Sequence, residues 1–309
     1  MENKKGQLFI LMALAIVALM AATFQIYNVL EKRSLVNTRV QTMDDFLKAL
    51  EINLERELYT SGFRIIFLAE DEIVSTGGYI ENFSSFFNEA FENGTVNGEP
   101  KDIMIGATKS DLIDSMNEKA SKINANVFLS DVSTSYSQVD PWNVQFVFSF
   151  NLSLEDNSNL ARWERFQEIT TLVGVEGFED PIYIVNTNAL VSRKINRTIY
   201  EGNYVVDSDI SNFYSHVFSG YYAESVNSPS FLNRLEGNLS QDDNGIESFV
   251  NLAELDSQGL PISDKTTTDH IYFSGQNPTH YGVTGMPSWF GVDDLYRRLE
   301  KYNLTKIIY

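Results

Sequence analysis

The sequence predicts an α+β protein with a long N-terminal transmembrane and stem helix, a helical region, and a globular head built on an antiparallel sheet. Three observations predict this class. Residues 8–24 contain no charge and no proline, and apolar residues then recur at helical spacing as far as residue 58. Even-numbered residues from 144 to 154 are apolar, with mainly polar residues between them. We expect four parts: a leader (1–6), a transmembrane helix (7–27), an amphipathic stem and helical region (28–123), and an extracellular head (124–309).

The segment from Leu8 to Phe24 has the length of a membrane anchor. Its 17 residues rise about 26 Å as a helix. Extending it to Tyr27 reaches the roughly 20 residues that cross a hydrocarbon core. Lys4 and Lys5 precede the segment, so the positive-inside tendency predicts a cytoplasmic amino end. We therefore expect a single-pass protein in the cell membrane, held by residues 8–27, with its bulk outside.

The stem is predicted to continue the same helix. No glycine occurs between Gly6 and Gly62, and the first proline is Pro100, so one helix is expected from about residue 7 to about residue 60. The apolar residues of its second half recur at three- and four-residue steps: Met43, Phe46, Leu47, Leu50, Leu54 and Leu58. We expect this stripe to pack against another copy of the chain or against a partner helix.

The residues before the anchor carry a family resemblance. Lys4, Lys5, Gly6 and Gln7 stand directly ahead of the hydrophobic stretch. This arrangement resembles archaeal type IV pilins and pilin-like proteins with a class III signal peptide. The resemblance implies that a prepilin-type peptidase cuts between Gly6 and Gln7. The hydrophobic helix would then be retained, as an anchor or as the core of a filament.

Other readings of this region stay open. Many pilins carry a glutamate a few residues inside the helix, whereas this chain has apolar residues from Phe9 to Leu11. The departure bears on filament polymerisation more than on membrane insertion. An uncleaved signal-anchor is one alternative. A conventional signal peptide cut near Thr23 is another.

Further elements are expected along the rest of the chain. Helices are predicted for residues 83–91, 109–123, 210–222 and 292–302, with shorter ones near 231–232 and 249–255. The helix at 210 is expected to be capped by Asp207 or Ser208. Strands are predicted to begin near Asn126 and to cover 144–154, 163–173 and 269–274, and residues 182–185 are expected to be a short strand or a packed connection.

Composition and motifs restrict the chemistry. The chain has no cysteine and a net charge of −19, so disulfides, thiolate sites and nucleic-acid binding are not expected. We find no catalytic motif and expect neither an enzyme nor a cofactor. A weaker candidate for a metal site consists of Asp269, His270 and His280. We expect these to be ordinary polar residues of loops and strands rather than metal ligands.

Six sequons of the Asn-x-Ser/Thr type are compatible with an outside location. Their asparagines are the glycosylation candidates Asn82, Asn93, Asn151, Asn196, Asn238 and Asn303.

These observations leave three classes of function. The first is a pilin-like surface protein with a structural, adhesive or assembly role, in contact with other subunits. The second is a signal-anchored monomeric binding protein. An exported hydrolase is the least favoured, because no nucleophile–base pair is visible.

Overall fold

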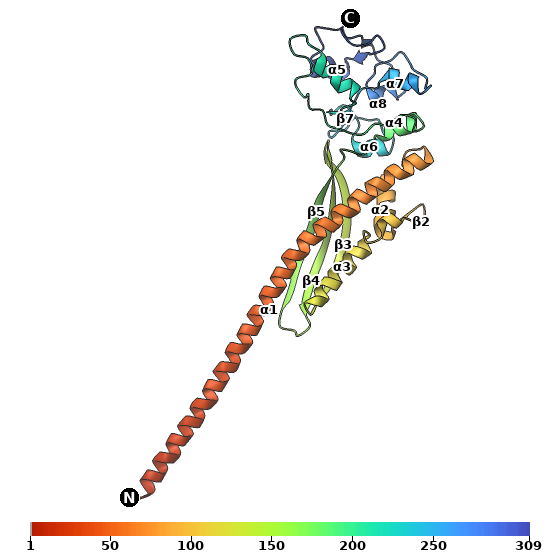
Figure 1. Ribbon diagram of the computed structural model, residues 1–309. Helices are drawn as coiled ribbons and strands as arrows, with labels where there is room; N and C mark the ends of the chain where they lie inside the picture. Colours follow the sequence, from red (N-terminus) through yellow and green to blue (C-terminus); the bar gives the residue numbers. More distant parts are fainter. Residues whose placement is uncertain (1) are drawn as a thin grey trace. The chain divides into compact units, whose positions relative to one another are not determined.

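The structure is a computed structural model that describes residues 2–309, with side chains from residue 6 onward (Figure 1). It is α+β, as the sequence predicts. The chain divides into two compact units. Unit 1 contains the chain up to Leu54 together with Ile113–Val132 and Ser149–Gln167. Unit 2 contains Glu55–Leu112, Ser133–Phe148 and Glu168–Tyr309.

Helix α1 runs from Glu2 to Thr76 without interruption. The expected end near residue 60 was wrong, because Gly62 does not break the helix. A Cβ at position 62 would lie 2.6 Å from the Phe146 ring, so this glycine permits close packing. The helix ends where Gly77 adopts a φ of +69° and its N–H donates to the Ile73 carbonyl at 2.9 Å.

Replacing Gly62 by leucine is expected to destabilise the protein by about 1–3 kcal/mol, because the new side chain overlaps the Phe146 ring in a packed core. The measurement is chemical denaturation of the detergent-solubilised chain. Ser75→Leu, at an exposed position of the same helix, is the matched control and should change stability by only about 0.5 kcal/mol. Equal stability of the two variants would contradict the packing argument.

Three long strands form a sheet in the order β3-β4-β5, with β3 at Ala125–Asp140, β4 at Asn143–Asp156 and β5 at Arg162–Gly174. The predicted alternation of β4 is confirmed, since its even-numbered apolar residues are all buried. In β3 the alternation changes phase at Asp131, which has a φ of +52°. This is the signature of a β-bulge, in which one extra residue shifts the inward positions from odd to even numbers.

The core of unit 1 joins α1 to α3 (Lys109–Lys122) and to the strands. The helix predicted for residues 109–123 is thus confirmed. The buried apolar residues of this unit are Met43, Leu47, Leu50, Leu54, Met116, Ala120, Ala125, Val127, Phe150, Leu152 and Leu154.

Unit 2 adds short elements to its parts of α1 and the sheet. Its helices are α2 (Phe83–Asn93), α4 (Pro181–Asn186), α5 (Ser211–Phe218), α6 (Phe231–Leu235), α7 (Leu252–Ser257), α8 (Asp269–Tyr272) and α9 (Arg298–Lys301), with 3-10 turns η1 (Asp102–Met104) and η2 (Leu295–Arg297). Its two-residue strands pair antiparallel: β1 (Thr95–Val96) with β2 (Glu99–Pro100), β6 (Ala223–Glu224) with β7 (Ile246–Glu247), and β8 (His280–Tyr281) with β9 (Val292–Asp293).

Several local predictions in unit 2 were wrong. Residues 182–185 belong to helix α4, because Asp180 accepts the Ile182 N–H at 2.9 Å and Pro181 occupies the first turn. Residues 269–274 are not a strand, since α8 occupies 269–272 and a turn follows it. The expected cap of α5 was also wrong, because the N-cap residue is Ile210, while Asp209 before it accepts the Ser211 N–H at 2.9 Å.

The helix predicted for 292–302 is broken into β9, η2 and α9. Tyr296 and Arg297 both have positive φ, which an α-helix does not allow. The register of β9 explains the interruption, because Val292 pairs with Tyr281 and starts the segment as a strand. The helical spacing of these apolar residues therefore does not come from one helix. Leu295 lies in η2, Leu299 lies in α9, and Tyr302 is the C-cap of α9.

An aromatic cluster forms one core of unit 2. Phe213 lies 5.5 Å from Phe249 and 5.6 Å from Phe290, measured between ring centroids. Tyr302 lies 5.0 Å from Phe249 and 4.7 Å from Tyr204. These edge and tilted contacts bury large rings that the sequence distributes over about 100 residues.

Candidate membrane anchor and exposed surfaces

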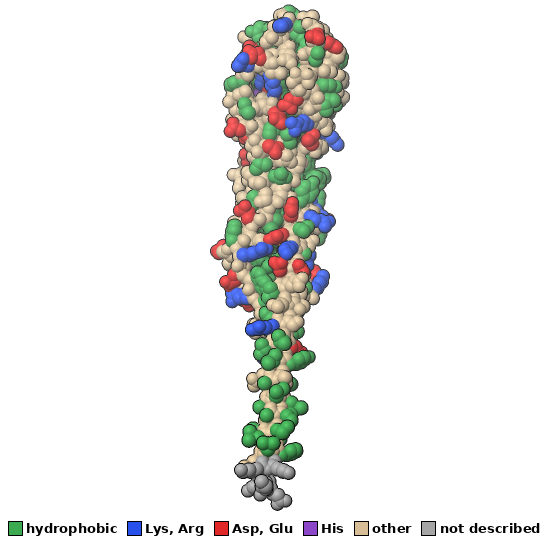
Figure 2. Space-filling model, turned by 90° about the vertical axis from the view of Figure 1, so that its left-hand side faces the viewer, with side chains coloured by type: hydrophobic (Ala, Val, Ile, Leu, Met, Phe, Trp, Pro, Cys, Tyr) green, Lys and Arg blue, Asp and Glu red, His purple; other side chains and the backbone are tan. Residues whose placement is uncertain are grey.

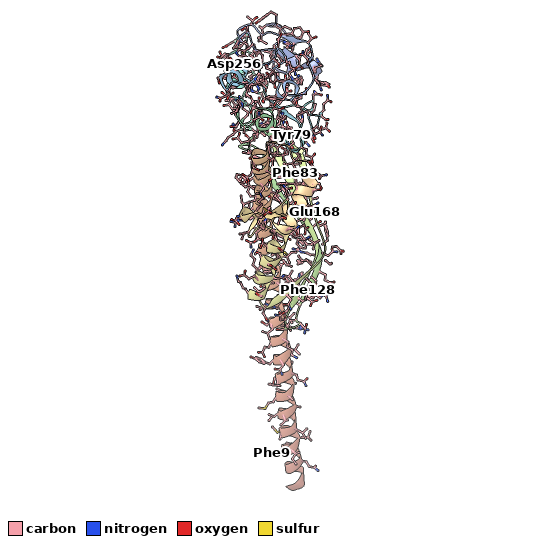
Figure 3. All side chains as sticks on the ribbon, turned by 90° about the vertical axis from the view of Figure 1, so that its right-hand side faces the viewer. Phe9, Tyr79, Phe83, Phe128, Glu168 and Asp256 are labelled. Atoms are coloured by element: carbon pink, nitrogen blue, oxygen red, sulfur yellow. The ribbon has the colours of Figure 1, made fainter. Side chains whose placement is uncertain are left out.

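The first part of α1 is apolar on all sides and exposed. Every large apolar side chain from Leu8 to Leu30 is half exposed or more, and Phe9 reaches 77%. Figure 2 shows these side chains around the helix, and Figure 3 shows Phe9 with no other segment beside it. The most apolar window has a mean hydropathy of 2.4 and none of it is buried. This helix is compatible with a single-pass membrane anchor.

The polar groups of the anchor are satisfied locally. The Thr23 hydroxyl donates to the Leu19 carbonyl at 3.0 Å and lies 2.9 Å from the Met20 carbonyl. All backbone groups in the apolar segment belong to a continuous helix. A hydrocarbon environment requires this, because it offers no other hydrogen-bond partners.

The proposed processing residues lie at the start of the helix. The side chains of Lys4 and Lys5 fall outside the described part of the structure. Gly6 and Gln7 are helical and exposed. A Cβ at Gly6 would meet nothing within 4 Å. Glycine is less favourable than alanine in a helix by about 1 kcal/mol, so packing within this chain gives no reason for glycine here.

Arg39 marks the entry of α1 into the folded part of unit 1. Its Nε forms an ion pair with Asp156, and its Nη2 donates to the Asn124 carbonyl at 2.7 Å. The Asp156 side chain is only 1% exposed and also accepts the N–H groups of Ser158 and Leu160. The guanidinium therefore joins the helix to the turn between β4 and β5.

The predicted stem stripe does not face a partner. Met43, Leu47, Leu50, Leu54 and Leu58 are each at most 3% exposed, and Phe46 is half-buried. The chain covers this stripe with its own side chains, so the expectation that it packs against a copy or a partner helix was wrong. A helical period identifies an apolar face but not what covers it.

A different face of α1 is apolar and exposed in unit 2. Tyr59, Phe63, Phe67 and Val74 follow each other at four- and seven-residue steps, which place them on one side of a helix. Each is 41–52% exposed. We call these four residues the outer stripe. The ring of Phe63 lies 5.2 Å from that of Phe178, which is buried, so Phe63 connects the outer stripe to the core of unit 2.

The metal candidates do not come together. Asp269 is buried and accepts hydrogen bonds from Arg234 and Ser248, and His270 Nδ1 lies 3.1 Å from its Oδ1. His280 instead places its Nε2 3.2 Å from Asp264 Oδ1. The described residues contain no group of three or more acidic, histidine or cysteine side chains that could hold an ion.

This cluster also does not have the geometry of a catalytic triad. In a triad the histidine lies between the serine and the carboxylate, where it can take the serine proton. Here Asp269 lies between Ser248 and His270, with the Ser248 hydroxyl donating directly to the carboxylate at 2.9 Å. Ser248 is fully buried, so it is not placed to attack a substrate.

All six sequon asparagines are exposed. Asn82 caps α2 by accepting the Ser85 N–H at 2.8 Å, and Asn151 donates to Asp131 at 2.7 Å. Accessibility therefore does not separate the six glycosylation candidates from one another.

A buried ion cluster connects four short elements of unit 2. Arg234 on α6 is fully buried and its Nη1 lies 2.6 Å from Asp180 and 2.9 Å from Asp269. Its other nitrogens donate to the Ile246 and Pro229 carbonyls. Burial opposes ionisation of Asp269, but the charges of Arg234 and His270 outweigh it and lower its pKa to about 2.

The sequence analysis missed this cluster because its members are far apart in the chain. Asp180 and Asp269 are 54 and 35 residues from Arg234, and no motif links them. A second missed group, Glu70, carries a signal that could have been found. It follows Ile66 and precedes Ile73 on the helical face that is buried, where a carboxylate is unusual.

Comparisons with known proteins find no match for the chain. No family model, no curated protein and no solved structure matches it.

Proposed function

We propose that this chain is a membrane-anchored, outward-facing, pilin-like surface protein with a structural, adhesive or assembly role. The observation that carries the proposal is the exposed apolar start of α1 and its unbroken continuation into the folded part of the chain. One helix then serves as both the anchor and a core element. Cutting it near Thr23 would detach the anchor, whereas cutting after Gly6 would keep it.

Two further observations support processing and assembly. Gly6 has no packing role among the described residues, so its presence next to Gln7 fits recognition by a prepilin-type peptidase. The outer stripe offers an apolar surface outside the membrane segment, which favours contact with other subunits over a monomeric binding protein. The alternative, a monomeric binding protein, would be favoured if the outer stripe stayed exposed to solvent at high protein concentration.

The amino terminus of the mature protein tests the proposal. We expect the chain purified from the membranes of producing cells to begin at Gln7, as measured by intact mass and by sequencing of the terminal peptide. Gly6→Leu should retain residues 1–6 and remain in the membrane fraction. Ala22→Leu is the matched control, because it changes the site near Thr23 and should leave the Gln7 terminus unchanged.

Each other outcome contradicts part of the proposal. An intact Met1 in the unaltered chain would contradict the pilin-like interpretation and would indicate an uncleaved signal-anchor. A terminus near Thr23, lost in Ala22→Leu, would identify a conventional signal peptide. Electron microscopy of cell surfaces then separates assembly into filaments from display of single molecules.

A further inference from the structure

A cavity of about 350 Å³ lies in unit 2, at the lower end of the range of about 300–1,000 Å³ typical of small-ligand pockets. Aromatic rings of His280, Trp289 and Tyr309 line it, together with the aliphatic side chains of Leu252 and Ile262. No expected site from the sequence analysis includes this combination.

Two glycines make room for two of these rings. A Cβ at Gly282 would lie 2.5 Å from the Tyr309 ring, and one at Gly291 would lie 2.6 Å from the His280 ring. The Tyr309 backbone is held in register, since its N–H donates to the Gly282 carbonyl at 3.0 Å and its carbonyl accepts the Gly282 N–H at 3.2 Å. Both rings therefore lie directly on the backbone that forms the wall of the cavity.

The third ring is fixed by its neighbours. Trp289 meets Phe218 edge-on at 5.8 Å and Phe290 edge-on at 6.1 Å, between ring centroids. Phe290 is only 2% exposed, so it supports the indole from the core side, whereas the indole remains half-buried. The cavity thus presents a preformed aromatic surface, which reduces the entropy lost when a ligand binds.

The polar groups of the cavity disfavour an anionic ligand and can bind hydroxyl groups. Asp264 contributes an exposed carboxylate, which accepts hydrogen bonds, and Ser263, Ser288 and Tyr309 contribute hydroxyls that donate or accept. None of the described residues that line the cavity is a lysine or an arginine. With a net charge of −19 on the chain, an anionic ligand would meet no compensating charge here.

We propose that this cavity binds a neutral sugar ring. One face of a pyranose carries C–H groups that pack on an aromatic face, and its edge carries hydroxyls that a carboxylate and tyrosine can bind. Trp289 and Tyr309 supply the stacking surface, and Asp264, oriented by His280 Nε2 at 3.2 Å, accepts from the sugar hydroxyls. The inference rests on the proposed surface location, and it names neutral sugars as the ligands of the proposed adhesive role.

Binding is tested on the full chain in a detergent without a sugar headgroup, such as lauryldimethylamine oxide. The probes are glucose, galactose, mannose, N-acetylglucosamine, their β1,4-linked disaccharides and a sulfated galactose, measured by saturation-transfer NMR and calorimetry. We expect saturable binding of at least one probe. Tyr309→Ala, at a 71% exposed position, should weaken it at least tenfold without loss of folding. Asp264→Asn should weaken binding as well, because the charged acceptor of the sugar hydroxyls is lost. Folding should not change, because the Asp264 side chain is exposed.

Trp163→Ala is the matched control, since Trp163 lies on β5 in unit 1 and should leave binding unchanged. Absence of binding by every probe at tens of millimolar concentration would overturn the proposal. So would binding that survives both Tyr309→Ala and Asp264→Asn, or binding of a sulfated sugar in preference to its neutral parent. Membrane retention and the Gln7 terminus are measured separately, so failure here leaves the proposed function standing.

Discussion

Replacing Arg234 by leucine is expected to destabilise the protein by about 3–5 kcal/mol, because it leaves two carboxylates buried without their counter-charge. Asp180 would keep only the Tyr222 hydroxyl at 2.7 Å and the Ile182 N–H as partners in its side-chain network. Asp269 would keep Ser248 and His270. Losses of this size are a large fraction of the total stability of a typical domain.

The measurement is urea denaturation of the detergent-solubilised chain, followed by near-ultraviolet circular dichroism. Arg197→Leu is the matched control, because this arginine of unit 2 forms ion pairs at the surface with Glu201 and Glu224. Surface pairs contribute about 0–1 kcal/mol. A triple change of Arg234→Met, Asp180→Asn and Asp269→Asn should recover part of the loss. An Arg234→Leu variant as stable as the control would contradict the role of the cluster.

Replacing Glu70 by glutamine is expected to stabilise the protein at pH 8 and to remove a loss of stability between pH 4.5 and 8. Burial raises the pKa of Glu70 from 4.5 to about 8, and the charges of Glu179 and Asp180 add to the rise, against the Glu179 N–H and Lys194. Glu70 Oε1 and Glu179 Oε2 are both buried without a hydrogen-bond partner among the described residues.

The direction in which stability changes with pH follows from proton binding. Between pH 4.5 and 8 the folded chain keeps the Glu70 proton while the unfolded chain has lost it, so stability falls as pH rises. The slope is at most about 1.4 kcal/mol per pH unit. His216 acts in the opposite direction, since burial lowers its pKa from 6.5 to about 3 and stability rises with pH between these values. The window from pH 6.5 to 8 therefore separates the effect of Glu70 from that of His216.

Denaturation midpoints of the unaltered chain and of Glu70→Gln at pH 6.5, 7.2 and 8 check this prediction. The difference between the two proteins should grow with pH. Asp71→Asn is the matched control, because the neighbouring carboxylate is exposed and its loss should give a difference that does not depend on pH. A constant difference for Glu70→Gln would show that Glu70 ionises normally in the folded chain.

The sequence by itself determined the elements that depend on local pattern. The start of α1 has an uncharged, mainly apolar composition, α3 has helical spacing, and β4 alternates over twelve residues from Asn143 to Leu154 with one exception at Val147. Each of these patterns is long enough to outweigh competing local conformations. The absence of a glycine between Gly6 and Gly62 also predicted one continuous helix, although not its end at Thr76.

Only the tertiary structure decided what covers each surface. The stem stripe from Met43 to Leu58 is buried by the chain itself, and Gly62 continues the helix because Phe146 packs against it. Residues 182–185 became helical behind the capping Asp180, and residues 269–272 became helical where the Asp269 side chain pairs with Arg234. Arg234, Trp289 and Glu70 meet side chains that lie roughly 35 to 110 positions away in the chain. A local pattern can show that a side chain is apolar or charged, but burial and charge pairing arise only when distant segments meet.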